Sequence, residues 1–104
     1  LDEAPNGFTG LDLAVATSWQ LVSQGVFSQQ DFVRLWCEAP AKVFNLPHNS
    51  MKAGSKADFF LFDPSREWLV SAENLKSKSC NTPWLGETLR GKVCAHWISG
   101  QRLV

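Results

Sequence analysis

The residues that could bind a metal ion or act as a nucleophile are few and far apart in the chain. His48 and His96 have no histidine or carboxylate partner at the spacing of an H-x-H or H-E-x-x-H motif. Cys37, Cys80 and Cys94 form no C-x-x-C pair, and their odd number favours a reducing compartment over a disulfide framework. We therefore expect no metal site and no catalytic residue in this chain, and we expect buried or incidental thiols.

Two aspartates flank a short apolar run, but their pattern does not favour a catalytic carboxylate pair. Asp63 precedes Pro64, and this dipeptide commonly opens a turn. Asp58 is expected to accept a hydrogen bond from nearby backbone. Each carboxylate therefore has a structural explanation.

The segment before the first predicted helix is the best candidate for binding an anion. Asn6 and Gly7 give a strong turn signal, because both residue types tolerate positive φ. The spacing of Gly7 and Gly10 is not a G-x-G-x-x-G motif, and no strand precedes it. Exposed backbone N–H groups ahead of a helix can still hold an anion.

Composition limits the partners that this chain can have. Hydrophobic residues make up 44% of the 104 residues and charged residues 19%, which excludes intrinsic disorder. Lys and Arg number 10, as do Asp and Glu, so nothing in the charge favours a nucleic acid or an anionic membrane surface. No apolar run approaches the ~20 residues that a membrane span requires. The start at Leu1, without a Met or an apolar leader, is typical of a cut end.

Aromatic content suggests that the chain has more apolar surface than it can cover. It contains five Trp and seven Phe but no Tyr. Large rings without hydroxyl groups must be buried to stabilise a fold. We expect that 104 residues do not bury all of them alone.

Helices are predicted in the first half of the chain. Apolar residues at helical spacing, beginning with Leu11, predict a helix over 11–24, and Gly25 suits its end. Ser28 and Asp31 have the spacing of a capping box before a second helix over 29–38. That helix should end before Pro40, which could open a further short turn over 40–44.

Strands are predicted in the second half. The apolar run 57–62 has the length and aromatic content of a strand buried on both faces, and a weaker strand follows around Trp68 and Val70. Residues 76–91 are expected to form a long irregular loop, and such loops are usually functional or held against another segment. Residues 93–97 alternate as a strand, with a hairpin turn at Ser99-Gly100. Helices followed by strands indicate an α+β fold.

Four stretches of the chain together resemble one protein family. These are APNGFTGLDLA at 4–14, EAPAKVFNLP at 38–47, AGSKADFFLFDPSREWLV at 53–70 and SKSCNTPWLGETLRGKVCAHWISGQ at 77–101. The third stretch is similar to a strand found throughout the amidohydrolase superfamily. The first and last resemble dihydroorotases of the bacterial, long-chain type. Asn45 stands where that family usually has Gly, and Trp84 where it usually has Phe.

The resemblance implies that the chain is the C-terminal portion of a larger enzyme. Residues 1–46 would be the loop after strand eight and the last helices of a metal-dependent-hydrolase TIM barrel. Residues 47–104 would be the C-terminal strands of its β-sandwich subdomain. The family converts N-carbamoyl-L-aspartate to dihydroorotate and back in pyrimidine biosynthesis, with zinc held by residues outside this chain. Its substrate-binding loop maps onto Asn6 and Gly7.

The resemblance also implies partners and leaves alternatives open. The expected partners are the N-terminal remainder of the enzyme, a small-molecule substrate, a second copy in a homodimer, and aspartate transcarbamoylase in some relatives; nucleic acid and membrane are not expected. The expected location is cytoplasmic. One alternative is a metal-free homologue that acts as a structural partner of aspartate transcarbamoylase. Another is a different cyclic amidase, such as a hydantoinase or an allantoinase.

Overall fold

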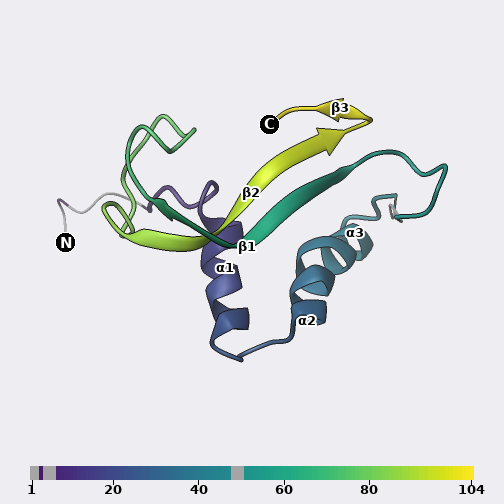
Figure 1. Ribbon diagram of the computed structural model, residues 1–104, viewed down its shortest axis with the longest axis horizontal. Helices are drawn as coiled ribbons and strands as arrows, with labels where there is room; N and C mark the ends of the chain where they lie inside the picture. The colour runs from purple at the N-terminus through teal and green to yellow at the C-terminus, as the bar shows by residue number, and fades with distance from the viewer. Residues whose placement is uncertain (1–2, 4–6, 48–50) are drawn as a thin grey trace.

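The chain forms an α+β structure in which a long β-hairpin carries the helices on one side (Figure 1). The computed structural model describes residues 3, 7–47 and 51–104. The helical elements are α1 (Ala14–Ser23), α2 (Gln29–Val33), the π-helix η1 (Arg34–Glu38) and α3 (Ala39–Val43). The strands are β1 (Phe59–Leu69), β2 (Thr88–Ile98) and β3 (Gln101–Arg102), which form one antiparallel sheet in the order β1-β2-β3. The predicted α+β class is confirmed.

Helix α1 begins later than predicted. The backbone makes a tight turn first, in which the Leu13 N–H donates to the Gly10 carbonyl at 3.0 Å. Leu11 therefore precedes the helix and is 87% exposed, so its prediction as the first residue of the helix is wrong. The helix ends as predicted at Gly25, whose φ of 74° is a conformation that glycine adopts without strain.

The second helical segment continues through Pro40, so the prediction that it ends there is wrong. The predicted capping box is present, because the Ser28 hydroxyl accepts from the Asp31 N–H and the Asp31 carboxylate accepts from the Ser28 N–H. A π-helical turn then precedes the proline, and the Ala39 N–H donates to the carbonyl of Arg34, five residues earlier. We infer that this wider turn makes room for the proline ring, which in a regular helix would press on the carbonyl four residues before it.

Asn45 ends this helical segment in a left-handed conformation. Its φ is 51°, the Leu46 N–H donates to the Ala41 carbonyl at 2.8 Å, and the Asn45 N–H donates to the Lys42 carbonyl at 3.3 Å. These two bonds define a Schellman motif, whose left-handed position usually holds Gly and sometimes Asn. Asn at this position is therefore compatible with the same backbone as the family's usual Gly.

The predicted strands around 57–62 and around Trp68 are one continuous strand, β1. Asp63-Pro64 does not end it, because the pairing with β2 resumes after an irregular register shift between Asp63 and Glu67. Strand β2 begins at Thr88, so the irregular loop is shorter than predicted. Ser99 and Gly100, with φ of 51° and 80°, form the predicted two-residue hairpin turn.

The expectation that the apolar run in β1 is buried on both faces is wrong for this chain. Leu61 is 53% exposed, and Phe59, Phe60 and Phe62 are only partly buried. The described residues supply too few elements to cover both faces of this strand.

Two apolar groups join the helices to the hairpin. The apolar core contains buried residues from α1, its preceding turn and the strand region: Leu13, Ala16, Val70, Leu75 and Leu89. The aromatic cluster joins α1, α2 and β1 through Trp19, Phe32 and Phe62, with ring centroids 5.2 to 6.2 Å apart. These contacts fix the start of α1 against the sheet and so position the segment before it.

Candidate functional site

The segment that precedes α1 is held by the irregular loop between β1 and β2. The Thr9 N–H donates to the Asn81 carbonyl at 2.7 Å, and the Asn81 side-chain Nδ2 donates to the Gly7 carbonyl at 3.0 Å. Asn81 thus bonds the backbone on both sides of Phe8. The rings of Phe8 and Trp84 lie 5.8 Å apart between their centroids. The two segments are more than 70 residues apart in sequence, so the fold alone brings them together.

Asp12 makes a second connection between the same segments. Its Oδ2 accepts three hydrogen bonds, from the Lys76 N–H at 3.1 Å, the Ser77 N–H at 2.9 Å and the Ser77 hydroxyl at 2.8 Å. Partial burial alone would raise the pKa of Asp12. The hydrogen bonds from Ser77 and Lys76 outweigh that effect and hold the pKa below its ordinary value. The ionised carboxylate is therefore the form that ties the loop to the start of α1.

The loop between the strands is itself well fixed. Leu75 is buried in the apolar core, and Thr82 is buried at 9% exposure. The Leu85 N–H donates to the Thr82 carbonyl at 3.2 Å, which closes a turn around Pro83. Gly86 and Glu87 exchange hydrogen bonds with Val70, so the loop leads directly into the paired strands. The expectation that this loop is held against another segment is confirmed.

Of the two predicted substrate-binding residues, the structure describes one. Asn6 lies outside the described residues. Gly7 is exposed, its φ is +94°, and a Cβ added there would meet no atom within 4 Å. Glycine is therefore favoured at this position by backbone conformation and not by lack of space.

The other candidate residues are dispersed. His48 lies outside the described residues, and His96 packs edge-to-face against Phe60 with ring centroids 6.3 Å apart. The Asp58 carboxylate accepts from the Ser99 N–H, so it binds nearby backbone as predicted, and this backbone belongs to a segment that is distant in sequence.

The second aspartate has a local structural role, and the three cysteines are free thiols. Asp63 accepts from both the N–H and the hydroxyl of Ser65, at 2.9 and 2.7 Å. Cys37 is an exposed free thiol, while Cys80 and Cys94 are partly buried free thiols. Within residues 3, 7–47 and 51–104, no three His, Cys, Asp or Glu side chains lie close enough to hold a metal ion.

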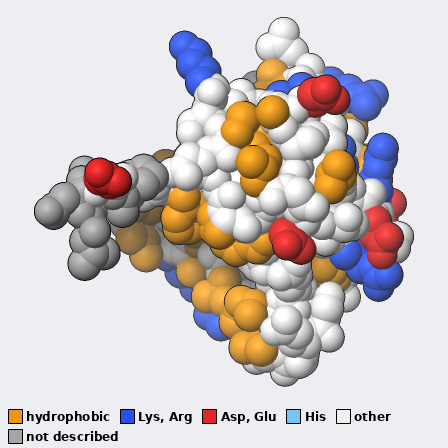
Figure 2. Space-filling view, turned by 90° about the vertical axis from the view of Figure 1, so that its left-hand side faces the viewer, with side chains coloured by type: hydrophobic (Ala, Val, Ile, Leu, Met, Phe, Trp, Pro, Cys, Tyr) orange, Lys and Arg blue, Asp and Glu red, His pale blue; other side chains and the backbone are white. Residues whose placement is uncertain are grey.

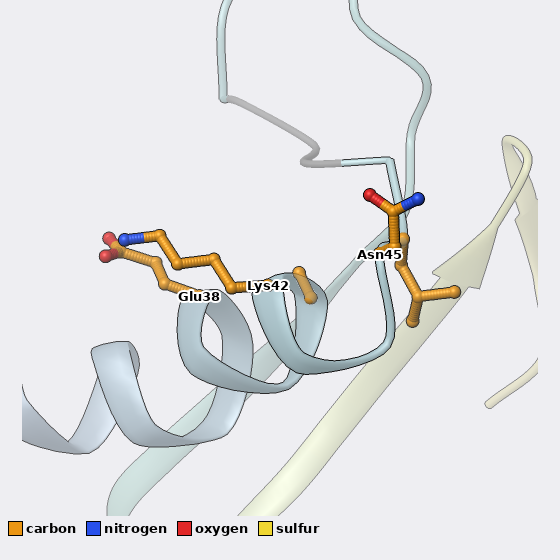
Figure 3. Close-up of a pocket in the computed structure, with 5 residues that line it drawn as sticks. Glu38, Lys42 and Asn45 are labelled. Carbon is orange, nitrogen blue, oxygen red and sulfur yellow. The ribbon is translucent and has the colours of Figure 1, made fainter.

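A hollow of about 430 Å³ lies beside α3 (Figure 3), and Gly7 is not among the residues that line it. It is lined by Glu38, Ala41, Lys42, Asn45 and Leu46. Figure 3 shows Glu38 and Lys42 extending in the same direction, while Asn45 lies on the other side of the hollow. This lining includes no serine, threonine, cysteine or histidine.

Figure 2 faces the end of the molecule that bears the segment before α1 and the irregular loop. Hydrophobic side chains are visible at the surface there, and Phe8, Leu69 and Leu85 are each at least 50% exposed. Among the described residues, no helix is both long and apolar enough to cross a membrane.

Comparison with known proteins shows what the chain is similar to. No family model matches the chain. The dihydroorotase of Syntrophus aciditrophicus (strain SB) is 37% identical over 98 residues, which cover 94% of this chain and 23% of that enzyme. The dihydroorotase of Anaeromyxobacter dehalogenans (strain 2CP-1 / ATCC BAA-258) is 39% identical over 103 residues, covering 99% of this chain and 24% of that enzyme.

The chain is a homologue of dihydroorotase. It spans about a quarter of the length of the curated relatives that it matches, and the resemblance to their C-terminal portion is confirmed. A structure described as D-hydantoinase superposes with a TM-score of 0.81 and 27% identity, over 96% of this chain and 22% of that chain. Both matches fit the amidohydrolase superfamily.

The sequence singled out Gly7 as a candidate but not the residues that hold its segment. Asp12 and Asn81 lie within the family-like stretches 4–14 and 77–101, but nothing in those stretches shows that each bonds a segment distant in sequence. The length of the irregular loop gave a second signal, since it indicated a loop fixed by contacts elsewhere.

Proposed function

We propose that this chain is the C-terminal segment of a cytoplasmic dihydroorotase, which interconverts N-carbamoyl-L-aspartate and dihydroorotate in pyrimidine biosynthesis. Residues 1–46 would complete the enzyme's TIM barrel, and residues 47–104 its β-subdomain. The homology to enzymes named dihydroorotase over nearly the whole chain supports this proposal. The superposition on a D-hydantoinase supports the broader assignment to the cyclic amidohydrolases.

The zinc that the resemblance implies does not fit the described residues of this chain, because no three of their His, Cys, Asp or Glu side chains lie close enough together to hold it. It would have to be held by the remainder of the enzyme. When bound there, it would supply an activated hydroxide. The contribution that we propose for this chain is substrate binding by the backbone at Asn6 and Gly7, on a loop after a barrel strand, where TIM-barrel sites lie.

One observation carries the proposed role of this loop. The Gly7 carbonyl is bonded by Asn81, and the Thr9 N–H is bonded by the carbonyl of the same residue. A backbone that is already held in one conformation can present N–H groups to a carboxylate with little further loss of conformational entropy when the ligand binds. Both proposed substrates, N-carbamoyl-L-aspartate and dihydroorotate, carry carboxylates that such donors recognise.

The test is turnover by the full-length protein that contains this chain, with dihydroorotate, hydantoin and allantoin as alternative substrates. We expect dihydroorotate to be the preferred substrate. Preference for hydantoin or allantoin would contradict the substrate assignment and favour another cyclic amidase. Absence of turnover together with binding to aspartate transcarbamoylase would favour the non-catalytic homologue.

Variants of the loop test its role in the same assay. Gly7→Val should impair substrate binding, because φ of +94° strains a β-branched residue, while Asn6→Ala should have a mild effect if the backbone is the donor. Gly25→Val is the matched control, since Gly25 also has positive φ and open space around it but lies at the far end of α1. Equal effects of Gly7→Val and Gly25→Val on substrate binding would show that the segment before α1 is an ordinary turn with no role in binding.

A further inference from the structure

We propose that Asn81 is a positioning residue, which sets the orientation of the Gly7–Phe8 peptide group for substrate binding. This inference rests on the proposed function of the Gly7 loop. Asn81 would not contact substrate. It would act by holding the Gly7 carbonyl, and with it the peptide group that directly follows the backbone proposed to bind substrate.

Apolar packing does little to hold this segment in place. Phe8 is 61% exposed and Leu11 is 87% exposed, so neither anchors the backbone by burial. The hydrogen bonds made by Asn81 and Asp12 are therefore the main connections of residues 7–12 to the rest of the fold. Of these, only the Asn81 side chain bonds Gly7.

The bond to the Gly7 carbonyl fixes the direction of the adjacent amide. In a trans peptide group the C=O and N–H bonds point to opposite sides. No peptide bond of the described structure is cis, and the Gly7 carbonyl points toward Asn81. The Phe8 N–H of the same peptide group is therefore directed away from the irregular loop, whereas the Thr9 N–H is occupied by the Asn81 carbonyl.

Asn81 is suited to hold another segment because its own backbone is fixed. Its N–H donates to the Ser79 hydroxyl at 3.2 Å. The next residue, Thr82, is buried, and Pro83 then restricts the turn. The amide group of Asn81 thus extends from a rigid element toward a segment that has little packing of its own.

The matched variants are Asn81→Ala and Asn74→Ala. Asn74 is also exposed, and its Nδ2 donates to the Leu69 carbonyl at 2.9 Å, but that bond does not reach the segment before α1. Asn81→Asp is a second variant, which keeps the shape of the side chain and removes the donor. The backbone carbonyl of residue 81 remains available to the Thr9 N–H in every variant.

Two measurements test the positioning role of Asn81. In the full-length enzyme, Asn81→Ala should raise KM about 2- to 10-fold, the range for loss of one hydrogen bond, with kcat changed less than about twofold. Hydrogen exchange of the Thr9 amide should accelerate by a similar factor, about 2- to 10-fold, because the segment opens more often. Asn81→Asp should do the same, and Asn74→Ala should change neither quantity.

An unchanged KM in both Asn81 variants, or an equal rise in Asn74→Ala, would overturn the inference. A wild-type protein without turnover would instead reject the proposed function. In that case faster Thr9 exchange in the Asn81 variants alone would still support positioning of Gly7, and unchanged exchange would overturn it.

Discussion

Gly91 lies in β2 where two aromatic rings pack closely against the strand. Its φ is +102°, and a Cβ added there would lie 2.6 Å from Cζ of Phe62 and 3.5 Å from Cδ1 of Trp19. The strand is irregular in this region, since the regular pairing with β1 is interrupted between Asp63 and Glu67. Glycine is thus required here both for its conformation and for the aromatic cluster to approach the sheet.

Gly91→Ala should lower the free energy of unfolding by about 2–4 kcal/mol, from overpacking together with the positive φ. Gly100→Ala is the control, because Gly100 has a φ of +80° and no atom within 4 Å of an added Cβ. Gly100→Ala should lower the free energy of unfolding by only about 1–2 kcal/mol, because only the positive φ opposes the added Cβ. Chemical denaturation of both variants measures these free energies. Equal losses of stability would show that the rings of Phe62 and Trp19 do not restrict the residue at position 91.

The connection that Asp12 makes between the start of α1 and the irregular loop should depend on pH. Its pKa is lowered in the folded chain, so the carboxylate contributes stability above its ordinary pKa of about 3.9, and that contribution is lost as the pH falls through the folded value. The amide proton shift of Ser77 should titrate with a midpoint below about 3.9. Asp12→Asn should abolish this titration.

Asp63→Asn is the control for that titration. The pKa of Asp63 is also lowered, by hydrogen bonds from Ser65, but these bonds are local and do not reach the irregular loop. The Ser77 titration should therefore persist in Asp63→Asn. A Ser77 midpoint at or above the ordinary aspartate value would contradict the role assigned to Asp12.

Local signals in the sequence predicted local features well. The capping box at Ser28 and the positive-φ turn at Ser99-Gly100 are both specified by residues close together in the chain. The contacts of Asp12 and Asn81 could not be predicted, because nothing near either residue indicates its distant partner. The sequence therefore predicted Gly7 as a candidate but did not predict the contacts of Asp12 and Asn81 that hold its segment in place.

At the scale of elements, two breaks expected from proline did not occur. Pro40 lies inside a continuous helical segment because a π-helical turn precedes it. Pro64 lies inside β1 because an irregular stretch of the pairing accommodates it. Proline excludes a regular hydrogen bond at its own position, but it does not determine whether the neighbouring backbone adjusts.

Strand β1 has an unpaired edge within the described part of the chain. The sheet order β1-β2-β3 gives β1 one strand neighbour, and the apolar Leu61 is 53% exposed. Exposed apolar edge strands pair with other chains. We expect the isolated chain to self-associate, as measured by sedimentation over a range of concentrations.

Leu61→Lys should weaken that association, because a charge on an edge strand opposes pairing. Val26→Lys is the control, since Val26 is 60% exposed in the connection between α1 and α2, which is not part of the sheet. A chain that is monomeric at all concentrations, or equal effects of the two variants, would contradict this account of β1.

The whole molecule exposes more surface than a compact monomer of its size. Its accessible surface is 8017 Å², whereas a monomer of 11.6 kDa is expected to expose about 5,800 Å². Its radius of gyration is 15.7 Å, compared with about 13 Å for a compact domain of this length. The excess supports the proposal that the remainder of a dihydroorotase covers part of this surface.

Reconstitution tests the central proposal, that this chain is a working segment of a dihydroorotase. The quarter of the Anaeromyxobacter dehalogenans enzyme that matches this chain would be removed. The truncated enzyme would then be mixed with this chain, or, as the positive control, with the fragment that was removed. Where the enzyme's own fragment restores turnover of dihydroorotate, we predict that this chain binds the truncated enzyme and also restores it. Restoration by the enzyme's own fragment, with neither binding nor turnover from this chain, would contradict the proposal.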